Sequence, residues 1–177
     1  MKVIYARQPL PFVNRAGGLV SQSIFLVGPT PRERSIPSWR PEALKILEDL
    51  NFEGTVFVPE DEGWGHFSPD THQEQIWWEI KALGVTSCVA VWLNRELPHM
   101  PAFTTNTEVG LLLAFKPERL VFGIPPTARK TNYQATLARD LVQLHEAFGR
   151  YYVNANNAPI ADTMHGMLSI AVQMADV

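Results

Sequence analysis

The chain has 177 residues, of which 46% are hydrophobic and 19% are charged, and this suits one globular domain with a substantial core. The composition excludes a disordered chain and a membrane protein, and no apolar run is long enough to cross a bilayer. The formal net charge of −3 argues against nucleic acid as a partner, because a nucleic-acid footprint needs an excess of basic residues.

The single cysteine and the N-terminus bear on the compartment. Cys88 lies in an apolar run and has no second cysteine with which to form a disulfide. Residues 1–7 lack the long apolar core of a signal peptide. We therefore expect a cytoplasmic protein with no membrane partner.

Short apolar runs alternate with helical patterns along the chain. Strands are predicted over residues 2–6, 23–28, 55–58, 88–93 and 119–123. Helices are predicted over residues 39–50, 68–83, 105–115, 133–148 and 160–174. In the helix at 68–83, the pattern places Ile76, Ile80 and Leu83 inward and makes Gly84 the C-terminal stop.

This alternation is typical of a parallel sheet with helices on both faces. We predict a single Rossmann-like (flavodoxin-like) α/β domain over residues 1–177, with a mainly parallel sheet of about five strands. The C-terminal helices, at about residues 133–175, are expected to close the domain or to assemble it with another copy.

Residues 104–115 open with hydroxyl and amide side chains, carry one carboxylate, Glu108, and then become apolar. Because this stretch lies between two predicted strands, its beginning should face the ligand crevice of an open α/β sheet. Thr105 and Glu108 also match the S/T-x-x-E capping box, in which two side chains satisfy free backbone N–H groups. On spacing alone the capping box is the stronger interpretation, and a catalytic carboxylate is the alternative.

Glu79 is a second candidate for chemistry. It lies beside the predicted apolar stripe of its helix, with His72 on the same edge. A carboxylate beside apolar side chains is partly desolvated, which raises its pKa and suits a general acid or base. The alternative is a solvated surface glutamate, as most helical glutamates are.

The turn after the strand at 23–28 contains Gly28, Pro29 and Arg32, which could wrap a sugar or a phosphate. A proline-stiffened, solvated loop is the alternative, and the turn is neither a G-x-G-x-x-G fingerprint nor a P-loop. Trp39 lies in or beside a loop after a strand, where an aromatic ring could stack on a base, although core packing is the default for every tryptophan here. If Trp77 packs in the core, Trp78 needs another cover, such as a partner subunit.

The remaining reactive residues form no known pattern. The histidines and the single cysteine lack metal-ligand spacing, and no G-x-S-x-G elbow occurs. We therefore expect no metal, no cofactor and no serine nucleophile.

Five short motifs occur in order between about residue 1 and Tyr133. They are Ile24-Phe25-Leu26-Val27-Gly28-Pro29, Ser38-Trp39-Arg40, Val58-Pro59-Glu60, Gln75-Ile76-Trp77-Trp78-Glu79 and Thr104-Thr105-Asn106-Thr107-Glu108-Val109-Gly110. Their order and spacing resemble the nucleoside 2-deoxyribosyltransferase-like family.

The resemblance implies that Glu108 is the nucleophile, which attacks the anomeric carbon of a (deoxy)nucleoside and forms a covalent glycosyl-enzyme. A second base or water would then take the sugar. An acidic residue on the preceding helix helps to protonate the departing base, and that position falls on Glu79, where relatives often have aspartate. Two carboxylates also serve in retaining glycosidases, at a separation of about 5–5.5 Å.

Electrostatic arguments agree with these roles. A helix N-terminus would keep Glu108 ionised, and the apolar flank of Glu79 would keep that carboxyl protonated. With the resemblance included, the catalytic interpretation of Glu108 outweighs the capping interpretation. Glu60, Asn94 and Asn106 are further candidates for sugar or base contacts.

Three different functions stay open beside a nucleoside enzyme. In related nucleoside 5′-monophosphate N-glycosidases a serine before the nucleophile helps to hold the phosphate, and residues 100–103 contain none, which favours nucleosides. Arg32, Arg34 and Thr105 could nevertheless contact a phosphate. The chain could also be a non-catalytic nucleotide sensor, or an interaction protein that uses Trp78 and the C-terminal helix. The resemblance in addition implies a homo-oligomer.

Overall fold

The strands of the chain form one six-stranded sheet in the order β1-β3-β2-β4-β5-β6, and every neighbouring pair is parallel. The computed structural model describes residues 1–11, 18–31, 33, 35–63, 72–97, 99–149 and 157–176. The predicted α/β domain with a parallel sheet is confirmed, with six strands in place of about five.

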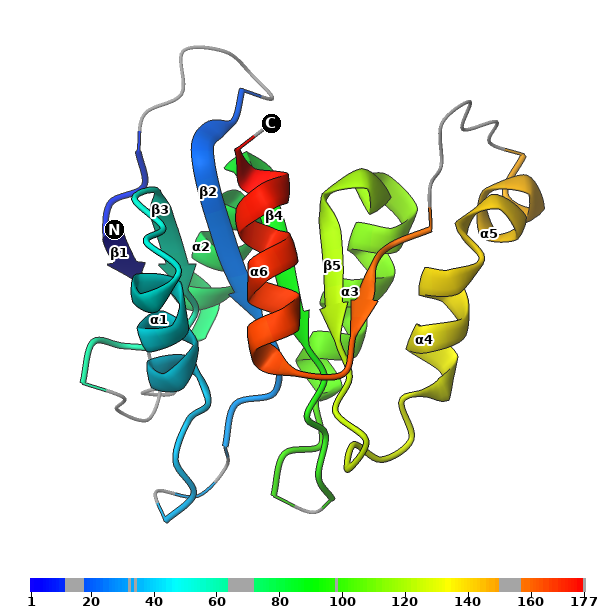
Figure 1. Cartoon of the computed structure of the whole chain (residues 1–177), viewed down its shortest axis with the longest axis horizontal. Coiled ribbons are helices and arrows are strands. Elements are labelled where there is room, and N and C mark those ends of the chain that lie inside the picture. Colours follow the sequence, from blue (N-terminus) through cyan, green and yellow to red (C-terminus); the bar gives the residue numbers. More distant parts are fainter. Residues whose placement is uncertain are drawn as a thin grey trace.

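The elements follow one another in alternation (Figure 1). The strands are β1 (Lys2–Tyr5), β2 (Val20–Val27), β3 (Thr55–Val58), β4 (Thr86–Trp92), β5 (Leu120–Gly123) and β6 (Ile160–Ala161). The helices are α1 (Arg40–Asp49), α2 (His72–Val85), α3 (Phe103–Phe115), the short 3-10 helix η2 (Pro117–Arg119), α4 (Asn132–Arg139), α5 (Leu141–Ala147) and α6 (Met164–Ala175).

Helices cover both faces of the sheet, so successive residues of a central strand enter two different cores. Along β2, Phe25 and Val27 join the core under α2, α3 and α4, whereas Ile24 and Leu26 join the core under α1 and α6. Figure 1 shows α1 and α6 in front of the sheet and α2 and α3 behind it. Burial on both faces explains why these strands read as continuous apolar runs.

The sheet order places a crevice where ligands bind in such folds. After β2 the chain turns to β3 on one side, and after β4 it turns to β5 on the other side. The connections therefore diverge between β2 and β4, at the carboxyl ends of the strands, which is the topological switch point of a doubly wound sheet.

The C-terminal region differs from the two helices predicted there. Asp140 interrupts the first helix, and its side chain accepts a hydrogen bond from the Gln143 backbone N–H at 3.2 Å, which begins α5. The residues Ile160–Ala161 form the sixth strand, and α6 begins only after Thr163, whose hydroxyl caps it by accepting from Gly166 N–H. A two-residue edge strand is too short to leave a recognisable pattern in the sequence.

Helix α2 is rotated relative to the predicted orientation. Ile76 and Ile80 are exposed, whereas Gln75 is buried. Trp78 is only 6% exposed and donates from Nε1 to the Gln8 carbonyl at 2.8 Å, while Trp77 is 57% exposed. The acceptor lies far away in the sequence, so helical spacing alone could not predict which tryptophan turns inward. The helix also continues through Gly84 to its last residue, Val85.

Helix α3 begins two residues before the predicted cap. Ala102 has a positive φ of 58°, and the helix starts at Phe103 with no side-chain cap. Thr105 therefore lies inside the helix, where it is buried, and Glu108 lies in the second turn. The capping-box interpretation is wrong, because the left-handed turn at Ala102 moves the start of the helix.

Candidate active site

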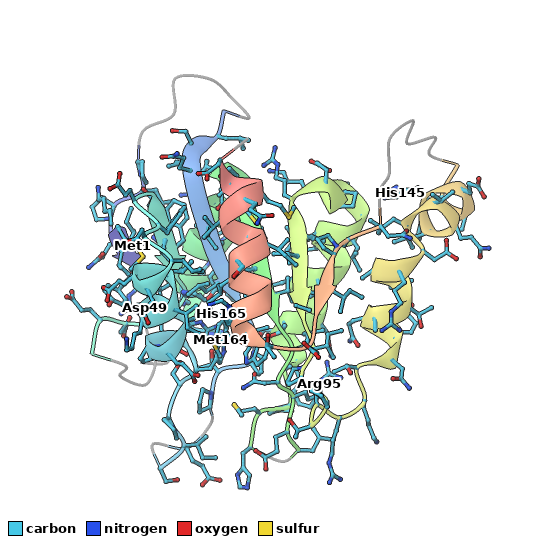
Figure 2. All side chains as sticks on the ribbon, viewed as in Figure 1. Met1, Asp49, Arg95, His145, Met164 and His165 are labelled. Carbon is cyan, nitrogen blue, oxygen red and sulfur yellow. The ribbon has the colours of Figure 1, made fainter. Side chains whose placement is uncertain are left out.

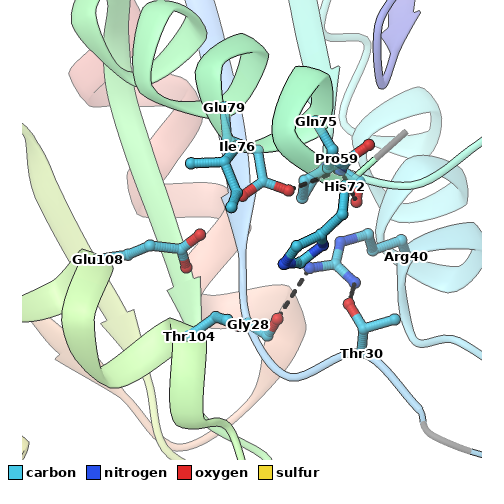
Figure 3. Close-up of a pocket in the computed structure, with 10 residues that line it drawn as sticks. All are labelled: Gly28, Thr30, Arg40, Pro59, His72, Gln75, Ile76, Glu79, Thr104 and Glu108. Carbon is cyan, nitrogen blue, oxygen red and sulfur yellow. Dashed lines mark hydrogen bonds between the residues drawn. The ribbon is translucent and has the colours of Figure 1, made fainter. Parts of the chain in front are cut away.

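A cavity of about 140 Å³ lies at the carboxyl ends of β2 and β3, against α2 and α3 (Figure 3). It has an apolar side formed by Ile76 and a polar side formed by carboxyl, guanidinium, imidazole and hydroxyl groups. Its lining comprises Gly28, Thr30, Arg40, Pro59, His72, Gln75, Ile76, Glu79, Thr104 and Glu108. Two of these, Glu79 and Glu108, are the carboxylates that the sequence predicts to be catalytic.

The side chains of Glu79 and Glu108 come from different helices and point toward one another across this cavity (Figure 3). Burial, followed by the negative charge of Glu79, raises the pKa of Glu108 to about 8, and the charge of Arg40 opposes both effects. Burial also raises the pKa of Glu79, and hydrogen bonding to Gln75 and the charge of Arg40 counteract this. At least the Glu108 carboxyl group therefore retains a proton near neutral pH.

This electrostatic arrangement differs from the expected one. Glu108 lies in the second turn of α3, so the N-terminal end of that helix does not hold it ionised, and its pKa is raised. Burial dominates at both carboxyl groups. In the free pocket, therefore, Glu108 retains a proton near neutral pH, and this side chain must lose that proton before it can act as a carboxylate.

Arg40 is a buried residue of the site that the sequence interpretation did not single out. It is 1% exposed and forms an ion pair of 2.5 Å with Glu60. Its other N–H groups donate to the carbonyls of Leu26 and Gly28 and to the hydroxyl of Thr30, at 2.9–3.3 Å. Arg40 thus ties the end of β2 to Glu60, in the turn after β3. Arg40 begins α1 and Glu60 follows β3, so no spacing in the chain indicated that these two charges would pair.

Gln75 was also missed. It is 3% exposed, and its Nε2 donates to the Pro59 carbonyl at 3.1 Å and to Glu79 Oε1 at 2.6 Å. The signal in the sequence was the spacing of four residues between Gln75 and Glu79, which places them on one face of a helix.

The family model described as "Nucleoside 2-deoxyribosyltransferase like" matches residues 21–128. The chain belongs to the nucleoside 2-deoxyribosyltransferase-like family. All residues that line the cavity lie within the matched range. No curated protein matches the chain. Membership supports a role in nucleoside chemistry.

Two of the predicted substrate contacts have structural roles at the end of β2. A side chain on Gly28 would lie 2.6 Å from the Trp92 carbonyl and 2.7 Å from the Trp39 ring, so only glycine fits there. Trp39 is buried and donates from Nε1 to the Pro29 carbonyl at 3.1 Å. Trp39 therefore shapes the turn from the core side, while Gly28 lines the cavity of this family member directly. Arg32 and Arg34 lie outside the described residues.

The other predicted contacts lie outside the cavity lining. Glu60 is buried against Arg40. The Asn106 Oδ1 atom accepts from Arg95, which follows β4, and from Gln134 Nε2 on α4. Thr105 and Asn94, near the same end of the sheet, each have a buried side-chain oxygen without a hydrogen-bond partner among the described residues. Figure 2 shows Arg95 near the carboxyl ends of the strands and His145 away from them.

The described residues bear on three further expectations, which concern a membrane span, a metal site and assembly. None of the helices within them has the length and apolar character needed to cross a membrane. Across the same residues, His, Cys, Asp and Glu side chains do not gather in groups of three or more that would hold a metal ion. Trp78, a candidate for assembly on the sequence, is buried, and α6 packs on the sheet through Met167, Leu168 and Ala171.

Proposed function

We propose that the protein cleaves or transfers at the N-glycosidic bond of (2-deoxy)nucleosides, with Glu108 as nucleophile and Glu79 as acid and base. The observation that carries the proposal is the facing pair of carboxyl groups in a cavity at the strand ends (Figure 3). Family membership supports the nucleoside as the substrate class. A carboxylate stabilises or captures the oxocarbenium-like state through which such a bond breaks.

In the proposed reaction, the carboxyl groups of Glu79 and Glu108 share one proton before substrate binds. When substrate binds, this proton passes from Glu108 to Glu79, and the ionised Glu108 attacks the anomeric carbon. The bond from that carbon to the base nitrogen breaks, its electron pair stays on the base, and Glu79 donates the proton that the base takes up. Water or a second base then attacks the anomeric carbon and gives a proton to Glu79, and Glu108 departs as a carboxylate.

The contacts of Arg40 argue for an uncharged nucleoside, rather than a nucleoside 5′-monophosphate, as the substrate. It is the one guanidinium among the lining residues that the structure describes, and it is already paired with Glu60 and bonded to backbone carbonyls. The two carboxyl groups would in addition repel a phosphate. A nucleoside 5′-monophosphate N-glycosidase, which ends in hydrolysis, is the alternative.

The test incubates purified protein with deoxynucleosides and their 5′-monophosphates, each with and without an acceptor base. Chromatography follows free base and exchanged nucleoside, and mass spectrometry of quenched samples seeks a deoxyribosyl adduct on the peptide that contains Glu108. We expect exchange or base release in wild type, with loss of about 10²-fold or more in Glu108→Gln and Glu79→Gln. Glu42→Gln, on an exposed face of α1, is the matched control.

Each outcome of this test has one meaning. Exchanged nucleoside identifies a transferase, and free base alone identifies an N-glycosidase. Preference for the 5′-monophosphates would overturn the choice of substrate. A protein that binds nucleosides but releases no base across the whole panel would be a sensor, and the catalytic proposal would fail.

We also propose that two copies associate through the apolar face of α2 and α3. Large apolar side chains are exposed on both helices, namely Ile76, Trp77, Ile80, Phe103, Leu111 and Phe115. Ile76 belongs to this face and to the cavity lining, so a second copy seated there would border the site. Light scattering should give a dimer mass for wild type and a monomer mass for Trp77→Glu. Tyr133→Glu, on α4, is the control for an exposed aromatic elsewhere, and a monomeric wild type contradicts the proposal.

A further inference from the structure

The amide of Gln75 is held in one orientation by its two partners. The Pro59 carbonyl can only accept a hydrogen bond, so the atom of Gln75 that faces it must be the NH₂ group. The same Nε2 atom donates to Glu79 Oε1 at 2.6 Å. Both hydrogens of the NH₂ group are therefore donated in hydrogen bonds, one to the Pro59 carbonyl and the other to Glu79.

This contact distinguishes the two oxygens of Glu79. In a protonated carboxyl group the carbonyl-type oxygen is the better hydrogen-bond acceptor, and the other oxygen carries the proton. Because Oε1 accepts from Gln75, the favoured protonated form has its proton on Oε2. Figure 3 shows that one oxygen of Glu79 lies on the Gln75 side, whereas the other lies on the side of Glu108.

Charged groups surround Glu79, but the hydrogen bond to its Oε1 atom comes from Gln75. Arg40 from α1, His72 from α2 and Glu108 from α3 all act on its carboxyl group. The guanidinium of Arg40 donates its N–H groups to Glu60, Thr30 and the carbonyls of Leu26 and Gly28. Within the described residues, Gln75 is the side chain whose N–H donates to Glu79 Oε1.

We propose that Gln75 is a positioning residue for Glu79, which occupies Oε1 and so directs the acid's proton to Oε2 on the Glu108 side. The role of Gln75 in catalysis rests on the proposed function. There, the proton that leaves Glu108 arrives on Glu79 Oε2 and is then donated to the departing base from the same oxygen. The rigid anchor on the Pro59 carbonyl keeps the acid in place through both transfers.

The first test measures, without any substrate, how the Gln75 contact affects protonation of Glu79. Carbon-13 NMR of labelled glutamate carboxyl groups follows the titration of Glu79 in wild type, in Gln75→Met and in Gln134→Met. Removal of the N–H donor should raise the pKa of Glu79 in Gln75→Met, because a hydrogen bond to the charged form is lost. Gln134, a buried glutamine that donates to Asn106, is the matched control and should leave that titration unchanged.

A second variant guards against a folding defect. Gln75→Asn retains a buried amide but is one methylene too short to join the Pro59 carbonyl to Glu79, so the pKa of Glu79 should again rise. Circular dichroism establishes that each variant is folded. If folded Gln75→Met or Gln75→Asn titrates as wild type does, the proposal is overturned.

The second readout is the pH dependence of the reaction. In Gln75→Met we expect kcat to fall by about tenfold with little change in KM, and the alkaline limb to move to higher pH. A purely structural contact would lower activity at every pH without moving the limb, and that result also overturns the proposal. If wild type itself releases no base, the proposed function fails, while the NMR titration still decides whether Gln75 controls the protonation of Glu79.

Discussion

Replacement of Glu108 by glutamine removes a carboxyl group whose ionisation opposes folding. The pKa of this group rises from an ordinary value of 4.5 to about 8 in the folded protein, mainly through burial. Between these two pH values the folded state retains a proton that the unfolded state has lost. Stability contributed by the protonated group is therefore fully present below pH 4.5 and is lost as the pH rises to about 8.

The magnitude follows from the width of this window. Each pH unit between 4.5 and about 8 costs the wild type about 1.4 kcal/mol relative to the glutamine variant, or about 5 kcal/mol in all. Water that enters the pocket screens part of the charge, so about 5 kcal/mol is an upper limit. Domains of this kind are stable by about 5–15 kcal/mol, and the difference is therefore easily measured.

The assay is urea unfolding of wild type, Glu108→Gln and Glu42→Gln at pH values from 4 to 9. The glutamine variant at 108 should gain stability over wild type as the pH rises, and the gain should level off above about pH 8. Glu42→Gln controls for the loss of one carboxylate from the surface, and Glu79→Gln shows the part that belongs to the partner carboxyl. Parallel curves for wild type and Glu108→Gln across this range would refute the reasoning about burial.

Three further predictions concern the same site. Activity should fall about tenfold per pH unit above about pH 8, where the carboxyl pair loses its last proton, and a flat profile to pH 10 would show that no proton is needed. Arg40→Met should destabilise the fold by about 3–5 kcal/mol in urea unfolding, because it leaves Glu60 charged, buried and unpaired; a loss below 1 kcal/mol would mean that water reaches the pair. Gly28→Ala should cost about 1–3 kcal/mol and lower nucleoside affinity, since the new methyl group meets the Trp92 carbonyl at 2.6 Å, and unchanged stability and affinity would argue against that close approach.

Local features of the chain were enough to predict the layered fold. The strands are buried on both faces, so their apolar runs are visible in the sequence without knowledge of their neighbours. Features set by a distant partner were not visible. Trp78 rather than Trp77 is buried because the Gln8 carbonyl accepts its N–H, and α3 begins early because Ala102 adopts a left-handed turn.

The parallel α/β architecture could be read from the sequence, because periodicity and apolar runs are local properties, whereas Glu79 and Glu108 became the leading catalytic candidates only through the resemblance to the family. Only the tertiary structure brought these two carboxyl groups face to face and raised the pKa of both, since burial and mutual repulsion depend on how α2 and α3 pack. It also supplied Arg40 and Gln75, whose roles consist of contacts to the ends of β2 and β3. Such contacts form when distant segments meet at one edge of the sheet, and no spacing in the chain records them.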